Sequence, residues 1–118
     1  MTRDEKHQVI EDLKNVFQQN TSVLLLTFSE ITVPDLTELR RKLKEEGSSY
    51  RVVKNTLAIR AAEETPVGQV SSYFEGPTAV AFSGGDPAGL AKALKEFVKS
   101  HPGFNFKAGV VEGQSVES

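Results

Sequence analysis

Two strand–helix–strand patterns in series constrain the fold of this chain more than any other feature of its sequence. The first joins an apolar run of strand length, Val23 to Phe28, to a helix with a leucine stripe and a short alternating strand. The second repeats this order after a turn at Gly76-Pro77. The expected segments are strand 23–28, helix 33–46, strand 49–53, strand 78–82, helix 87–100 and strand 104–111. This order predicts an α+β fold, a ferredoxin-like sandwich with a four-stranded sheet and two crossover helices on one face.

Capping signals set the ends of the two crossover helices. Thr32 can N-cap the first, with Pro34 in its first turn. Gly47 is placed to end that helix in the left-handed conformation. Asp86 can N-cap the second helix, and Pro87 takes its first helical position. These signals predict where each helix begins and where the first one ends.

Two further helical regions surround this pattern. Residues Arg3 to Gln19 form an amphipathic helix by periodicity, with Leu13 and Phe17 on its apolar side. An insertion at 55–74 begins with a helix at Asn55 and ends in one or two short helical turns. These helices could cover the second face of the sheet, which would explain why strand 23–28 is apolar throughout. A small three-layer α/β unit is therefore the alternative architecture.

Length and composition fit one compact domain. The chain has 118 residues, of which 38% are hydrophobic and 25% charged. We expect residues 1–112 to form the domain and residues 113–118 to be a small polar tail or the start of a linker. The longest apolar runs have only four residues and the N-terminus is charged, so neither a membrane segment nor a signal peptide is expected. The predicted location is the cytoplasm.

Few residues point to catalysis. There are no cysteines, which excludes disulfides, thiolate metal sites and cysteine nucleophiles. The two histidines, His7 and His101, lie near the ends of separate expected helices, whereas acid–base or metal chemistry needs them to converge. Gly84-Gly85 matches neither glycine-rich phosphate-loop pattern. We therefore expect a protein that is not an enzyme and that binds neither a cofactor nor a metal ion.

Charge is distributed unevenly along the chain. The net charge is −2, which by itself argues against nucleic-acid binding. Residues 40–60, however, hold seven basic and two acidic residues, a net charge of +5, whereas the rest of the chain holds seven basic and fourteen acidic residues. A localised basic patch attracts polyanions more than the average charge indicates. A solvated helix face with surplus basic residues is the alternative.

The basic segment includes a strand-to-helix junction. A helix N-terminus offers free N–H groups and the positive end of the helix dipole, which suits a phosphate. Lys54 is expected at that end, with Arg51 on the strand before it. Asn55 and Thr56 can either cap the helix or hydrogen-bond a phosphate or ribose hydroxyl. On these grounds alone, a cap at Asn55 and a solvated charge at Lys54 remain equally open.

The preceding helix adds Arg40, Arg41 and Lys44, at spacings that let pairs of them share a face. Ion pairs with Asp35, Glu38 or Glu45 are the competing explanation for these three side chains.

Several stretches in a fixed order resemble one protein family. The most specific are Val53-Lys54-Asn55-Thr56-Leu57 and, after it, Gly76-Pro77-Thr78-Ala79. The opening helix, Ser22 to Phe28, Leu36 to Leu43, Leu94 to Phe97 and Lys107 to Gly113 extend the likeness over nearly the whole chain. Together they resemble the N-terminal domain of the bacterial large-subunit ribosomal protein L-ten, at the base of the ribosomal stalk.

The resemblance implies a non-catalytic, RNA-binding role. Its members bind 23S rRNA at the GTPase-associated region, beside the ribosomal protein L-eleven. A C-terminal helix, which does not follow Ser118 here, carries L-seven/L-twelve dimers that recruit translational GTPases. The resemblance also implies that the opening helix and the Lys-Asn-Thr motif face the RNA. The residues implied by the resemblance and those of the basic segment together give the RNA-binding candidates, which are Arg3, Lys6, His7, Arg40, Arg41, Lys44, Arg51, Lys54, Asn55 and Thr56.

The alternative function is a small-ligand-binding regulatory domain of ferredoxin-like fold, because such folds host many unrelated functions. It would require a pocket with convergent polar groups, and the sequence shows none clearly.

Overall fold

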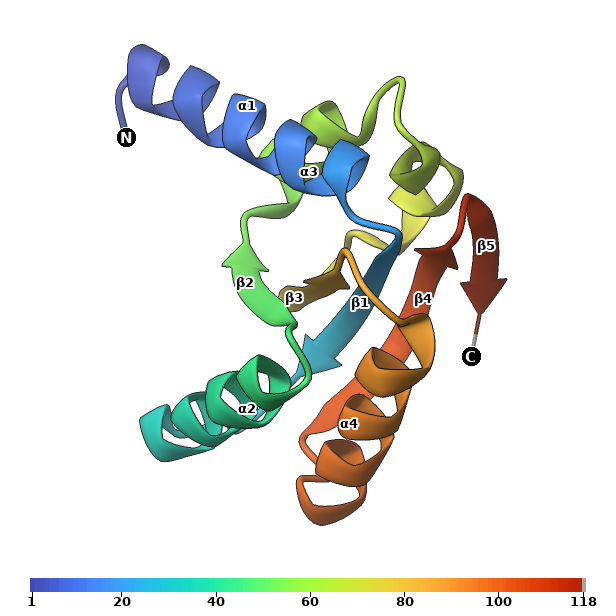
Figure 1. The fold of residues 1–118 in the computed structure, drawn as a ribbon. Helices are drawn as coiled ribbons and strands as arrows, with labels where there is room; N and C mark the ends of the chain where they lie inside the picture. Colours follow the sequence, from blue (N-terminus) through green and yellow to red (C-terminus); the bar gives the residue numbers. More distant parts are fainter. Residues whose placement is uncertain (118) are drawn as a thin grey trace.

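The computed structural model, which describes residues 1–117, is a five-stranded antiparallel sheet with helices on both faces (Figure 1). The strand order is β2-β3-β1-β4-β5, so β1 is central and β2 and β5 are the edges. The elements are α1 (Arg3–Gln19), β1 (Ser22–Phe28), α2 (Val33–Glu45), β2 (Ser49–Val53), α3 (Asn55–Ala62), the 3₁₀ helix η1 (Pro66–Tyr73), β3 (Thr78–Ser83), α4 (Pro87–Ser100), β4 (Phe104–Val111) and β5 (Gln114–Glu117). An α+β architecture is thereby confirmed.

Two hydrophobic cores lie on opposite faces of this sheet, because side chains alternate along each strand. Leu25 of β1 points into the core under α1, α3 and η1, where Phe17 and Val70 are fully buried. Leu26, its neighbour, points into the core under α2 and α4, which contains Leu39 and Phe97. The central strand is thus apolar throughout because both of its faces are covered, as its sequence indicated.

The expected caps are present. Thr32 and Asp35 form a reciprocal capping box, in which each backbone N–H donates to the other's side-chain oxygen at 3.2 Å. Asp86 accepts a hydrogen bond from the N–H of Ala88 at 3.0 Å, and Pro87 follows it as the first residue of α4. Gly47, with φ of +70°, follows the end of α2. These local signals fix where α2 and α4 begin and where α2 ends.

The fifth strand was not predicted. A four-stranded sheet and a polar tail over 113–118 were expected from the sequence, whereas β5 pairs with β4 through a two-residue turn at Glu112 and Gly113. Both turn residues have positive φ, the geometry that two-residue hairpins favour. Glutamate rarely adopts this conformation, so the turn lacks the Asn-Gly signature that reveals most such hairpins. Ser118 lies outside the described residues.

Candidate nucleic-acid interface

The β2–α3 junction is the centre of the candidate interface. Lys54 is the N-cap residue of α3, with an extended backbone (φ −88°) and an exposed side chain. Arg51 is exposed on β2. Neither side chain forms an ion pair with any other residue of the described chain. Both cations are therefore accessible to an anionic partner.

Asn55 has a structural role at this junction. Its side chain does not cap α3; the Nδ2 group instead donates to the carbonyl oxygen of Gly76 at 2.7 Å. This bond ties the start of α3 to the Gly76-Pro77 turn that precedes β3. The Asn55 Oδ1 atom is buried, without a hydrogen-bond partner in residues 1–117. The amide thus holds Lys54 and Thr56 in place, and of the two roles that the sequence left open for Asn55, that of an N-cap is excluded.

The exposed side of α3 adds two residues to the junction. Thr56 and Arg60 are both exposed and lie four positions apart, so they share one face of the helix. Arg60 belongs to the basic segment 40–60 but was not among the predicted RNA-binding candidates. Its spacing from Thr56 was the signal that could have identified it.

Helix α1 brings a second group of basic residues towards this side of the sheet. Its buried residues begin at Ile10 and pack it against α3. The preceding turns carry Arg3, Lys6 and His7, all exposed; Lys6 and His7 follow Arg3 by three and four positions, so each can lie beside it on the helix. These turns project beyond the sheet in Figure 1. The α1 group therefore belongs to the same helical layer as Lys54.

The three α2 candidates lie in the opposite layer. The Arg40 guanidinium sits over the Tyr50 ring, 5.4 Å from its centroid, and Arg41 pairs with Glu45 at 3.1 Å. Lys44 is exposed, with no ion pair in residues 1–117. Because Tyr50 faces the α2/α4 core, strand alternation places Arg51 on the other face. The basic segment is thus divided between two faces that meet at the β2 edge.

Comparison with known proteins identifies the family. The family model described as Ribosomal protein L10 matches residues 1–99. This chain belongs to the ribosomal protein L10 family. It is 45% identical over 116 residues to the large ribosomal subunit protein uL10 of Caldanaerobacter subterraneus subsp. tengcongensis, a match that covers 98% of this chain and 66% of that protein. The uL10 of Carboxydothermus hydrogenoformans is 40% identical over 114 residues, 97% of this chain and 65% of that protein.

The uL10 of Bacillus cereus strain B4264 is 37% identical over 111 residues, 94% of this chain and 67% of that protein. The chain thus spans about two thirds of the length of the curated relatives it matches. The resemblance to the L-ten family seen in the sequence is confirmed.

A histidine–carboxylate cluster in this L10-family chain is structural. His101 stacks on Phe97 with ring centroids 3.9 Å apart, and its Nδ1 lies 3.0 Å from the Phe97 carbonyl oxygen. Its Nε2 is 3.2 Å from Glu38 and 3.7 Å from Asp35. The cluster ties the end of α4 to the start of α2. His7 lies in the other helical layer, so the two histidines do not converge.

Two features are absent from residues 1–117. These residues contain no group of three or more histidine, aspartate or glutamate side chains placed to hold a metal ion. No helix among them combines the length and apolar character needed to cross a membrane.

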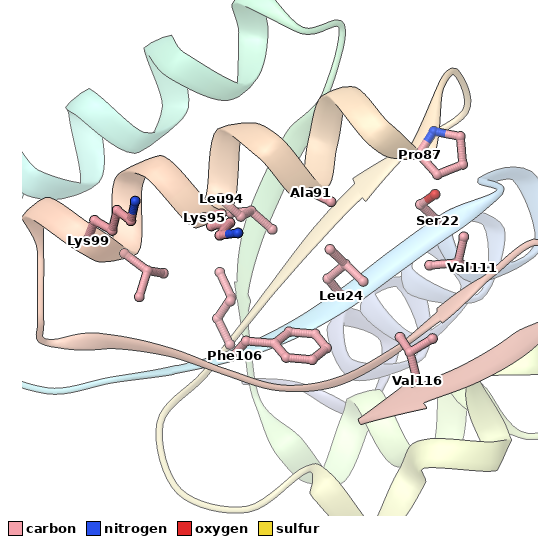
Figure 2. A pocket seen from close by; sticks show the side chains of 12 residues that line it. Ser22, Leu24, Pro87, Ala91, Leu94, Lys95, Lys99, Phe106, Val111 and Val116 are labelled. Carbon is pink, nitrogen blue, oxygen red and sulfur yellow. The ribbon is translucent and has the colours of Figure 1, made fainter. Parts of the chain in front are cut away.

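A largely apolar groove of about 490 Å³ runs beside α4 (Figure 2). We call it the α4 groove. It is lined by Ser22, Leu24, Leu26, Pro87, Ala91, Leu94, Lys95, Val98, Lys99, Phe106, Val111 and Val116. It lies on the α2/α4 side of the sheet, away from the α1 and α3 cations.

Proposed function

We propose that this chain is a non-enzymatic constituent of the large ribosomal subunit that binds 23S rRNA at the GTPase-associated region of the stalk base. Its relatives are large ribosomal subunit proteins. The observation that carries the proposal is the pair of accessible cations, Arg51 and Lys54, at a strand-to-helix junction of a chain whose net charge is −2. On this proposal the protein works in the cytoplasm, as part of the ribosome.

The proposed RNA surface consists of the α1 and α3 layer and the adjoining β2 edge. Arg3, Lys6 and His7 contact the RNA from α1, and Lys54 and Thr56 contact it from the junction. Asn55 positions these last two residues through its bond to Gly76. The remaining members of the surface are Arg51 and Arg60. On this proposal Arg40, Arg41 and Lys44 lie at its margin or outside it, because they project from the other layer.

Recognition on this surface is mainly electrostatic and geometric. Lysine and arginine neutralise phosphates and release counterions, whereas hydroxyl groups such as that of Thr56 can bond phosphate or ribose. Duplex RNA hides its base edges in a deep major groove, so backbone shape and 2′-hydroxyls are the accessible features. We expect affinity to fall steeply as salt rises.

The test is a binding titration with the GTPase-associated rRNA fragment at several salt concentrations. Lys54→Ala removes one phosphate contact, so affinity falls and the slope of log K against log salt decreases by about 0.7–0.9. Lys92→Ala, an equal charge change at an exposed site on α4, is the matched control and leaves both unchanged. Lys44→Ala reports whether the α2 layer participates. If Lys54→Ala behaves as Lys92→Ala does, the junction is not the RNA site.

The finer points of the proposal concern partners and architecture. The RNA-bound chain lies beside L-eleven, and L-seven/L-twelve dimers attach only to a C-terminal helix beyond residue 118. Residues 1–112 form the RNA-binding unit. We interpret strands β1 to β4, with α2 and α4 on one face, as a ferredoxin-like sandwich to which α1, α3, η1 and β5 are added.

A small-ligand regulatory domain is less well supported. Ligand sites combine an apolar lining with a few convergent polar groups. The α4 groove offers one buried hydroxyl, Ser22, and two lysines, and no convergent polar set. Thermal-shift screening with amino acids and nucleotides distinguishes the two functions, because only the ligand domain is stabilised by them.

A further inference from the structure

The α4 groove is a part of the α2/α4 core whose apolar side chains are incompletely covered. Side chains of α4 form one wall, and side chains of β1, β4 and β5 form the floor and the other wall (Figure 2). Phe106 and Val111 of β4 are only partly buried there, and Val116 of β5 is 38% exposed. On the opposite face, by contrast, η1 contacts both β4 and β5. The start of β4 is covered on both faces, because Phe104 is buried in the α2/α4 core. The rest of β4 and all of β5 are covered on one face only.

Polar groups around the groove indicate what could fill it. The Ser22 Oγ atom is buried, and it has no hydrogen-bond partner in residues 1–117. At the rim, Lys95 and Lys99 lie four positions apart on α4, both exposed and without ion pairs in the described chain. A matching occupant has an apolar stripe, a polar group that reaches Ser22 and acidic side chains beside the two lysines.

The relatives have a further segment, outside the matched residues, that is long enough to supply this occupant. The 116 matched residues are only 66% of the Caldanaerobacter protein, so about a third of its length lies outside the match. In this chain β5 ends at Glu117, one residue after Val116, which lines the groove. The N-terminal helix α1, in contrast, packs on the other face of the sheet. Only a segment that follows β5 would reach the groove through a short connection.

We propose that, in the longer chain of this family, the segment that follows β5 folds back as an amphipathic helix into the α4 groove. Its apolar stripe covers Leu24, Phe106 and Val116, and its acidic flank faces Lys95 and Lys99. The three groove positions Ala91, Lys95 and Val98 span about two turns of α4, so two to three turns of an added helix suffice. This packing places the rest of the longer chain on the side of the sheet opposite to the α1 and α3 cations.

A thiol-reactivity experiment tests this proposal, because the chain has no cysteine of its own. Ala91→Cys places one thiol in the groove, and Ala88→Cys places one on an exposed, non-lining position of the same helix. Each is made in residues 1–118 and in a chimera that continues into the C-terminal part of the Caldanaerobacter relative, with any added cysteine changed to serine. The reaction with a soluble disulfide reagent is followed for all four proteins.

The expected result is a thiol at Ala91→Cys that reacts at least tenfold more slowly in the chimera than in residues 1–118. The thiol at Ala88→Cys reacts equally in both. Equal rates at Ala91→Cys in the two proteins overturn the proposal. Protection within residues 1–118 that increases with protein concentration also overturns it, because a second copy would then fill the groove.

The result is independent of the proposed RNA function. Circular dichroism verifies that each variant folds, and rRNA titration of the chimera and of residues 1–118 is run in parallel. If the chimera protects the thiol at Ala91→Cys but does not bind rRNA, only the RNA proposal is contradicted. If it binds rRNA but does not protect the thiol, only the helix proposal is contradicted.

Discussion

The two faces of the sheet are covered to different extents. Under α1, α3 and η1 the core is closed across β1, β3 and β4, and the exposed outer side of this layer carries free cations. Under α2 and α4 the core reaches β2, β3, β1 and the start of β4 at Phe104, but it leaves the α4 groove open over the rest of β4 and over β5. The comparison shows a molecule with one surface of accessible cations and one apolar surface with an unfilled groove, on opposite faces of the sheet.

The largest effects are expected from truncating adjacent leucines that point to opposite cores. Leu25→Ala leaves a cavity in the closed core and should cost about 4–5 kcal/mol of unfolding free energy, near the upper end for such changes. Leu26 lines the open groove, where neighbouring side chains can move into the space that the substitution leaves. Leu26→Ala should therefore lower the unfolding free energy by only about 2–3 kcal/mol. Urea unfolding of both variants measures the difference. Equal costs would mean that the groove is as rigid as the closed core.

An intermediate effect is expected at Gly109 of β4, which lies opposite Leu24 of the groove floor. A Cβ atom there would approach Leu24 Cδ2 to 2.5 Å and the backbone oxygen of Val23 to 2.7 Å. Gly109→Ala should therefore destabilise by about 1–3 kcal/mol through overpacking, although alanine normally stabilises a strand relative to glycine. Ala108→Gly, on the closed face, is the companion variant. A neutral Gly109→Ala would show that the groove floor can shift.

The smallest effect is expected at the ion pair between α2 and α4. The hydrogen bond and positive charge of Lys42, 3.1 Å away, lower the pKa of Glu96. A carboxyl group whose pKa is lower in the folded than in the unfolded state stabilises the folded protein at pH values above the unfolded-state pKa. This stabilisation is lost as the pH falls through the folded-state pKa. Lys42→Met should therefore raise the Glu96 pKa and weaken the fold slightly near neutral pH, but not in acid.

NMR titration of Glu96, together with urea unfolding at neutral and acidic pH, measures both quantities. Lys44→Met, the same substitution at an exposed residue of the same helix that forms no ion pair in residues 1–117, is the control. If Lys42→Met lowered the unfolding free energy by the same amount at acidic as at neutral pH, the packing of the lysine's aliphatic stem, rather than its charge, would be what stabilises the contact between α2 and α4.

Much of the fold was predictable because its signals are local. The capping box at Thr32, the Asp86-Pro87 start of α4 and the unbroken apolar run of β1 each determine their own element. The family was predictable because the Lys54 motif and the Gly76-Pro77 turn occur in a fixed order. The role of Asn55 was not, because its partner, Gly76, lies 21 residues further along the chain.

The division of the candidate site between two layers also required the structure. Alternation in β2 already separated Arg51 from Tyr50, but it could not show which helices cover each face. The α4 groove could not be predicted from the sequence for a related reason. Its lining comes from α4 and three strands, and its open side depends on β5, whose turn at Glu112 carries no recognisable sequence signal.

The position of β1 at the centre of the sheet has a consequence for how the protein is made. Both of its neighbours, β3 and β4, come later in the chain, so its apolar edges stay unpaired while the rest is synthesised. At bacterial-range translation speeds, β4 is finished roughly 4 to 17 seconds after β1. Nascent chains are therefore vulnerable to aggregation through residues 23–26 during this interval, and any factor that shields them then would raise the yield of folded protein.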